Sequence, residues 1–180
     1  MTRHFIITFI ALLTSNIYAI GQTNNCKTKI VQLRFEKIQE VKSNRITDSL
    51  LTTAKLTDTI LVTDEEIKKF KIRLDSGCCT YAGQMFLTSH QYILTNKAIA
   101  RLSLSQISLC CGMPIAVYVD GKEIYRAMLW NSLSSFGNES ITATLIGDKL
   151  TFVNQLPSIP DFRNGSLANK KDLVNCLLKR

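Results

Sequence analysis

The chain has 180 residues, a formal net charge of +8, an apolar content of 46% and 6 cysteines. Its length fits one ordinary domain and excludes a large multidomain enzyme. The apolar content excludes a disordered chain, and cysteine is too sparse for a disulfide-dense miniprotein.

The first 21 residues are predicted to be a secretory signal peptide. Thr2-Arg3-His4 is a short cationic head, Phe5–Leu13 is an apolar run, and the small residues Ala19 and Gly21 mark two candidate cleavage points. The run is shorter than the roughly 20 apolar residues of a membrane-spanning helix. Residues 22–180 are therefore expected to form a single exported domain, periplasmic or extracellular, with no transmembrane segment in the mature chain.

The start of this domain shows short elements. Alternating apolar and polar residues over Lys29–Ile38 predict a half-buried strand, and Thr59–Val62 is a second, compact strand candidate. Ser43–Lys55 fits either a short helix or a loop. Thr63 and Glu66 have the spacing of a capping box, which predicts one turn of helix.

The middle of the chain reads as short strands separated by turns. Apolar residues alternate with charged ones over Phe70–Leu74, and Met85–Thr88 is another short strand candidate. Asp75 and His90 are interpreted as exposed turn residues. Asn96–Leu102 is predicted to be a short helix because its apolar residues fall on one side.

Two hairpins are the clearest elements. Asp120-Gly121 separates two strand patterns and suits a type I′ turn, which needs positive φ at both central residues. Gly147-Asp148 repeats this arrangement. The hairpin strands are predicted over Ile115–Val119, Lys122–Trp130, Ile141–Ile146 and Leu150–Val153. With an amphipathic C-terminal helix over Ala168–Leu178, the patterns predict one α+β domain dominated by antiparallel β-hairpins with short helices.

Gly112–Ser135 carries a set of features in sequence order. Gly112-Met-Pro precedes a strand, Asp120-Gly121 and Ile124-Tyr125 follow, and Trp130 stands before Leu133-Ser-Ser. This segment resembles small exported bacterial domains that have no assigned function. The resemblance spans about Asp64 to Arg180 and implies export and a compact fold. It implies no catalytic residue.

The cysteines are candidates for disulfides in an exported chain. Two pairs are vicinal, and neighbouring residues rarely bond to each other because their α-carbons are only about 3.8 Å apart. We expect bridges between the pairs and one that ties the two ends of the domain together. The candidates are Cys26, Cys78, Cys79, Cys110, Cys111 and Cys176. Free thiols and a thiolate metal site remain alternatives, although the pairs lack the usual zinc spacing.

An enzyme is the alternative from another class. His90 is the only histidine after the signal peptide, so a small hydrolase or thiol enzyme would have to use it with a serine or cysteine such as Cys79. The sequence has no nucleophile elbow, no cysteine-protease signature and no phosphate-binding glycine loop. We therefore assign no catalytic residue, no metal and no cofactor.

Basic and aromatic residues suggest what the domain binds. The basic residues are spread along the chain, which is typical either of a solvated surface or of contact with an anionic partner. Tyr118, Tyr125 and Trp130 could form a stacking surface, but their hairpin positions favour the core. The prediction is a non-enzymatic exported module, braced by disulfides, that binds a protein or an anionic envelope component, with nucleic acid disfavoured.

Overall fold

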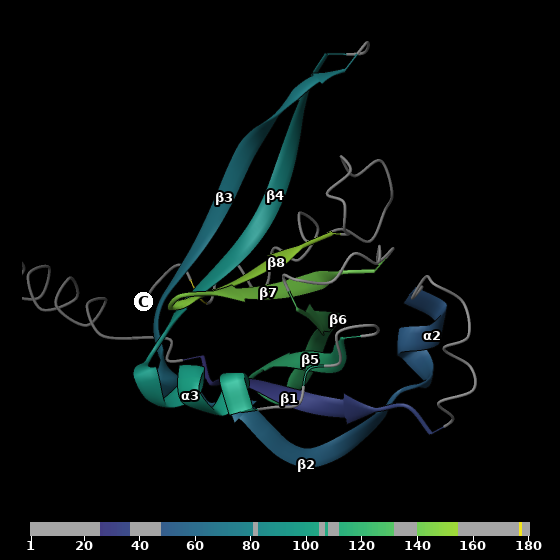
Figure 1. Cartoon of the computed structure of the whole chain (residues 1–180), viewed down its shortest axis with the longest axis vertical. Helices are drawn as coiled ribbons and strands as arrows, with labels where there is room; N and C mark the ends of the chain where they lie inside the picture. The colour runs from purple at the N-terminus through teal and green to yellow at the C-terminus, as the bar shows by residue number, and fades with distance from the viewer. Residues whose placement is uncertain are drawn as a thin grey trace, which may run out of the picture.

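The computed structural model describes residues 26–36, 48–80, 83–104, 107, 112–131, 140–154 and 177. The eight strands among them form one sheet in the order β2-β1-β5-β6-β7-β8-β4-β3 (Figure 1). They are β1 (Thr28–Arg34), β2 (Lys55–Val62), β3 (Ile67–Thr80), β4 (Gly83–Leu94), β5 (Met113–Val119), β6 (Lys122–Trp130), β7 (Thr142–Ile146) and β8 (Lys149–Val153). Neighbouring strands are antiparallel except β6 and β7, which are parallel. The helices are α2 (Asp48–Thr53), α3 (Asn96–Leu104) and the 3₁₀ turn η2 (Asp64–Glu66).

The sheet curls around one core. Val62 of β2 and Phe70 of β3 belong to the same buried cluster, although β2 and β3 are the two edges of the sheet. Only Thr63–Glu66 join these edge strands, so the edges have to approach each other. Helix α3 packs beside β2 and contributes Ala98 and Leu102 to the core, where both are fully buried.

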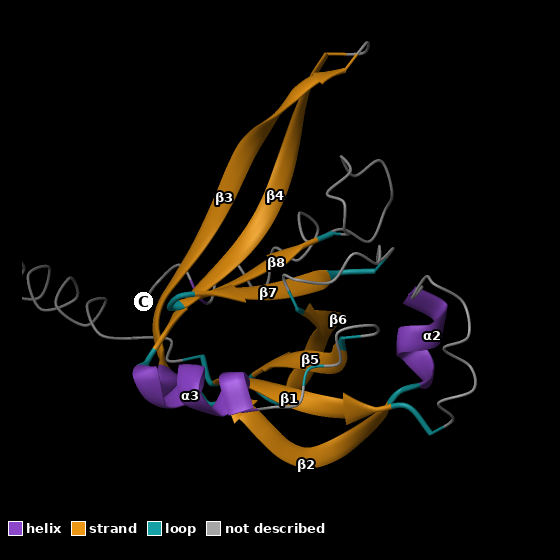
Figure 2. Ribbon diagram, in the orientation of Figure 1, coloured by secondary structure: helices purple, strands orange, loops and turns teal. Residues whose placement is uncertain are grey.

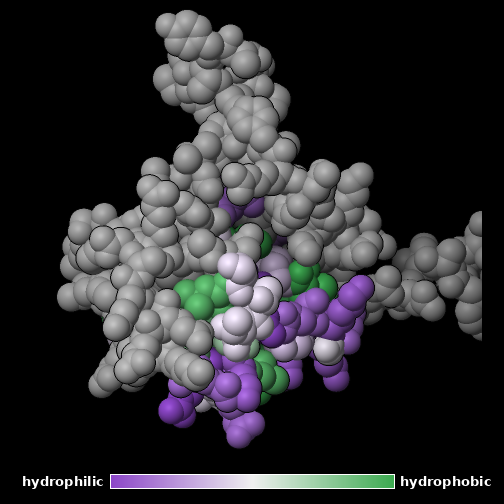
Figure 3. Space-filling view, turned by 90° about the vertical axis from the view of Figure 1, so that its right-hand side faces the viewer, coloured by the Kyte–Doolittle hydropathy of each residue, from purple (hydrophilic) through white to green (hydrophobic). Residues whose placement is uncertain are grey.

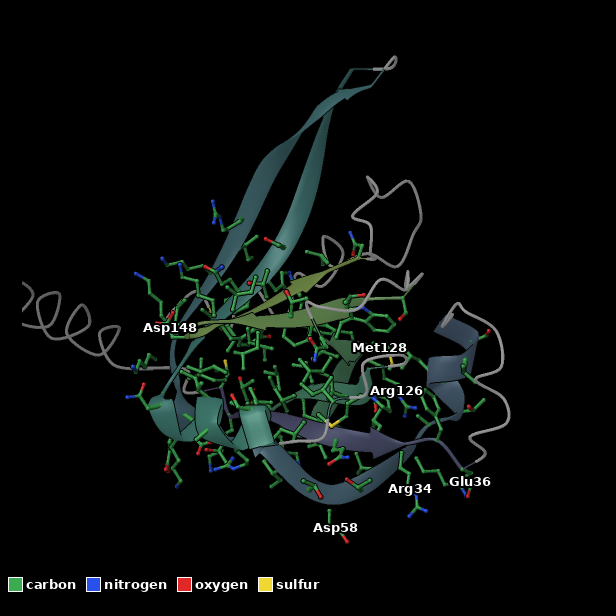
Figure 4. The ribbon with its side chains drawn as sticks, in the orientation of Figure 1. Arg34, Glu36, Asp58, Arg126, Met128 and Asp148 are labelled. Carbon is green, nitrogen blue, oxygen red and sulfur yellow. The ribbon has the colours of Figure 1, made fainter. Side chains whose placement is uncertain are left out.

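A second layer covers part of the opposite face. Leu51 of α2 packs against Met128 and Trp130 of β6. The Arg126 side chain lies beside α2 (Figure 4) and its Nη1 donates to three carbonyl oxygens at the end of this helix. The acceptors are Leu51 at 3.0 Å, Thr52 at 3.1 Å and Ala54 at 2.7 Å. A cation at a helix C-terminus satisfies otherwise unpaired carbonyls, so Arg126 anchors α2 to the sheet.

Several sequence predictions are confirmed. The Glu66 carboxylate accepts a hydrogen bond from the Thr63 N–H at 2.9 Å, which completes one half of the capping box. Asp120 and Gly121 both have positive φ, at 49° and 79°, as the type I′ turn requires. Strand β1 and the four hairpin strands lie close to the positions expected for them. The short helix α3 does so as well.

The predicted α+β class is wrong. The described chain is mostly β, in one mixed sheet with only α2, α3 and η2 as helical elements (Figure 2). The C-terminal helix expected over Ala168–Leu178 lies outside the described residues except for Leu177. The sequence patterns understated the sheet because they divided one long hairpin into separate short strands.

That hairpin, β3–β4, is also where the turn interpretations fail. Asp75 lies inside β3 opposite Leu87, and His90 lies inside β4 opposite Ile72. Cross-strand pairing keeps both residues extended, which their identity alone did not indicate. Only His90–Ile93 of β4 pair with β8, so the rest of the hairpin projects beyond the sheet as a two-stranded arm (Figure 1).

Candidate functional site

A shallow basic pocket lies on the sheet where β3, β4 and β8 run side by side. Its volume is about 360 Å³, and Lys71, Arg73, Gln91 and Lys149 line it together with Phe70 and Ile72. Three of these six residues are cationic. We call these six residues the basic pocket.

The strand pleat explains how the cations gather. Phe70 and Ile72 of β3 pack against the core, so the alternate positions Lys69, Lys71 and Arg73 share the opposite face. All three are exposed. Residues two apart on a strand are about 6.6 Å apart, which makes this face of β3 a line of positive charge.

Protection of a sheet edge explains part of this charge. β3 is an edge strand, and lysines on an edge discourage pairing with other chains. Lys149 does not fit this explanation, because β8 lies between β7 and β4 inside the sheet. Within the described ranges, no carboxylate oxygen lies within 4 Å of the Lys71 or Lys149 ammonium group. The pocket therefore concentrates positive charge beyond what the edge needs.

A buried polar side chain completes the pocket. Gln91 is only 7% exposed, and its Nε2 donates to Thr151 Oγ1 at 3.3 Å. This bond fixes the orientation of the amide between Lys71 on one neighbouring strand and Thr151 on the other. The basic pocket thus combines exposed cations with an amide held in place by a hydrogen bond, a set of groups that can bind an oxyanion.

His90 lies in the core. It is fully buried, and its ring centre is 5.5 Å from that of Phe70 and 6.0 Å from that of Tyr125. The predicted exposed turn is wrong for this residue. A general base has to reach its substrate, so this burial gives no support to the histidine enzyme.

Two tyrosines that share this core form a polar pair. The hydroxyls of Tyr92 and Tyr125 are 3.2 Å apart, and both side chains are buried. Burial is the main cause that raises the pKa of each phenol above its ordinary value of 10.0. Both tyrosines therefore stay neutral, and their hydrogen bond satisfies polar atoms that would otherwise be buried alone.

The other candidate aromatic residues form no stacking platform. Tyr125 is 5% exposed and Trp130 is 4% exposed. Tyr118 is half-buried on the face that α2 covers, and its hydroxyl donates to Glu123 Oε2 at 2.9 Å. The Lys29 Nζ lies 5.3 Å from the centre of the Tyr118 ring, within the range of a cation–π contact.

A partly buried ion pair holds α3 against the join between the edge strands. Glu66 is 5% exposed, and Arg101 of α3 binds its carboxylate at both oxygens, at 2.7 and 3.0 Å. The same guanidinium donates to the Leu61 carbonyl at 2.9 Å. The hydrogen bond from Arg101 is the largest cause that lowers the pKa of Glu66 below its ordinary value of 4.5.

This lowered pKa predicts acid sensitivity. A carboxyl with a depressed folded-state pKa stabilises the fold above its unfolded-state pKa, and this stability is lost as the pH falls through the folded-state value. The free energy of unfolding is therefore expected to fall below about pH 4.5. Urea titrations between pH 7 and 3 should show a smaller loss for Glu66→Gln than for the wild type. Equal pH profiles for the two proteins would contradict this role.

The cysteines are only partly placed. Cys26 is 3% exposed and disulfide-bonded, and none of the other five cysteine side chains is described. The backbone of Cys78 and Cys79 lies in β3 near the end of the arm, where the pairing register shifts between Gly77 and Thr80. Cys110, Cys111 and Cys176 lie outside the described residues. Within the described part of the chain, no three potential ligands gather as a metal site would require.

The sequence predictions missed the basic pocket. Lys71 and Arg73 were seen only as the polar half of an alternating strand. Gln91 and Lys149 drew no attention, because neither belongs to a motif. The available signal was the Lys69, Lys71, Arg73 spacing, which puts three cations on one strand face.

The remaining described surface is mixed. Figure 3 shows one face of the molecule, where small apolar patches lie beside residues of intermediate hydropathy and hydrophilic side chains gather below them. Among the described residues, the exposed large apolar side chains are those of Leu56, Ile60 and Ile146. None of the described helices has the length and apolar character needed to cross a membrane.

Comparison with known proteins finds no relative of this chain. No family profile matches the chain. No curated protein and no solved structure matches it either. The function therefore has to be argued from the geometry.

Proposed function

We propose that this protein is an exported, non-enzymatic binding module that holds an anionic partner in the basic pocket. The observation that carries the proposal is the convergence of Lys71, Arg73 and Lys149 from two strands around the buried amide of Gln91. Carboxylate, sulfate and phosphate groups all accept hydrogen bonds from these donors.

The exposure of the cations determines what kind of binding to expect. A single exposed ion pair contributes only about 0–1 kcal/mol, so several contacts are needed for useful affinity. A partner with repeated negative charges meets this need. Because exposed charges are screened within roughly 10 Å at 0.1 M salt, binding should weaken strongly as salt is added.

Two further features support an exported module. The N-terminal residues 1–21 have the pattern of a signal peptide, and Cys26 is disulfide-bonded, which suits an oxidising compartment. His90, the histidine that the alternative enzyme would use, is fully buried, which gives that alternative no support. These observations favour binding over catalysis.

Removal of the pocket cations should weaken this binding. Lys71→Gln/Lys149→Gln is expected to elute from an immobilised sulfated glycan at clearly lower salt than the wild type. The matched control is Lys27→Gln/Lys122→Gln, which removes the same charge from exposed lysines outside the basic pocket. Equal losses in the two variants would show that net charge, and not the pocket, governs retention.

We also propose that Cys26 is bonded to Cys176. Leu177 is 1% exposed and belongs to the same buried cluster as Cys26. Cys176 directly precedes Leu177 in the sequence. Mass spectrometry of an unreduced digest should find the Cys26 and Cys176 peptides linked. A Cys26 peptide linked to any other cysteine would exclude this pairing.

A further inference from the structure

We infer that the anionic partner is an acidic glycan, a polymer that carries both hydroxyls and carboxylate or sulfate groups. This inference rests on the proposed function and specifies its ligand. Three features support it: a row of polar side chains that leads away from the basic pocket, the spacing of the cations, and the burial of Phe70, the aromatic residue among the six.

A row of polar side chains crosses four strands from the basic pocket. Lys71 lies opposite Gln91, Gln91 opposite Thr151, and Thr151 opposite Thr144. Neighbouring strands are about 4.8 Å apart, so an amide and two hydroxyls follow the cation at regular intervals. We call Lys71, Gln91, Thr151 and Thr144 the polar row.

The cations run across this row. Lys69, Lys71 and Arg73 lie along β3 at intervals of about 6.6 Å, while Lys149 lies on β8 beyond β4. An extended ligand that follows the polar row therefore meets the β3 cations at one end, Lys149 near Thr151 on β8, and neutral hydrogen-bonding groups along the same path. Acidic glycans offer both kinds of group, since their sugars carry hydroxyls beside the acidic substituents.

Nucleic acid fits this face less well. Proteins that bind single strands without sequence preference stack the bases on exposed aromatic rings, and each stack contributes about 1–3 kcal/mol. Phe70 is the only aromatic residue that lines the basic pocket, and it is 4% exposed. Its ring packs against His90 and Tyr92 at centre-to-centre distances of 5.5 and 4.9 Å. Among the described residues that line the pocket, a nucleic acid would keep its phosphate contacts but find no exposed ring to stack on.

The test compares two probes on the full mature chain. An alginate oligosaccharide supplies carboxylates and hydroxyls, and oligo-dT of the same number of charges supplies phosphates and bases. The wild type should bind alginate more tightly than oligo-dT at equal salt. Thr151→Val and Thr144→Val should each weaken alginate binding about 3-fold or more, the effect of one lost hydrogen bond, and leave oligo-dT binding unchanged. Two variants are used because Thr151 also holds Gln91.

The outcomes separate the two claims. If oligo-dT binds as tightly as alginate, or if both threonine variants leave alginate binding unchanged, the glycan inference is overturned. The proposed function survives that result when Lys71→Gln/Lys149→Gln still weakens both probes. If this lysine variant binds both probes like the wild type, the proposed function itself is overturned.

Discussion

Gly112→Ala is expected to lower the free energy of unfolding by about 2–5 kcal/mol. Gly112 has φ +65°, which costs about 1–2 kcal/mol for a residue with a side chain. An added Cβ would also lie 2.7 Å from the Leu129 carbonyl oxygen and 2.8 Å from Cε3 of the Trp130 ring. Relief of such contacts requires shifts in a packed region, which add about 1–3 kcal/mol. Urea unfolding followed by the fluorescence of Trp130, the only tryptophan of the chain, measures the effect.

Gly121→Ala is the matched control for this prediction. Gly121 also has positive φ, at +79°, but no atom lies within 4 Å of an added Cβ. This variant should therefore lose only the conformational part, about 1–2 kcal/mol. If both variants lose the same stability, the close contacts of the added Cβ with Leu129 and Trp130 do not contribute, and the prediction is contradicted.

Arg101→Met is expected to lower the free energy of unfolding by about 3 kcal/mol. The substitution leaves the buried Glu66 carboxylate without its bidentate partner, and an uncompensated buried charge is strongly destabilising. It also removes the donor to the Leu61 carbonyl. Because this pair joins α3 to the segment between the edge strands, its loss should weaken closure of the sheet around the core. Urea unfolding at pH 7 provides the measurement.

Two companion variants make the Arg101 prediction specific. Lys97 also lies near Glu66, with its Nζ at 3.9 Å from Oε1, but its side chain is 80% exposed. Lys97→Met should therefore change stability by no more than about 0.5 kcal/mol. Glu66→Gln/Arg101→Met should recover part of the loss, because the buried charge is gone. A loss in Arg101→Met no larger than in Lys97→Met would contradict the role of the pair.

Local signals predicted a good part of the fold. The Asp120-Gly121 turn and the capping box of Thr63 and Glu66 depend on residues within four positions of each other, so the sequence shows them directly. The apolar patterns of β1 and of β5 to β8 lie within each strand's own residues and next to short turns. These elements were found because their cause is local.

The long arm and the α+β class show where local signals stop. Asp75 and Gly77 favour turns by composition, yet pairing with Leu87 and Met85 keeps them in β3. His90 carries a polar ring, yet its place on β4 opposite Ile72 and Phe152 puts it in the core. Cross-strand partners decide both outcomes, and no single segment contains them.

The basic pocket has the same origin. Lys71 and Lys149 are 78 positions apart in the sequence, and only the order β8-β4-β3 brings their strands together. Each lysine alone is typical of a solvated strand face. The sequence could therefore predict a basic exported module but not the place where its charge gathers.

The salt dependence of glycan binding tests the central claim most directly. The slope of log K against log salt concentration reports the number of cations that contact the polyanion, and each lost contact reduces it by about one. Lys71→Gln/Lys149→Gln should therefore have a slope about two units shallower than the wild type, while Lys27→Gln/Lys122→Gln should keep the wild-type slope. Equal slopes in all three proteins would contradict an anion site formed by β3, β4 and β8.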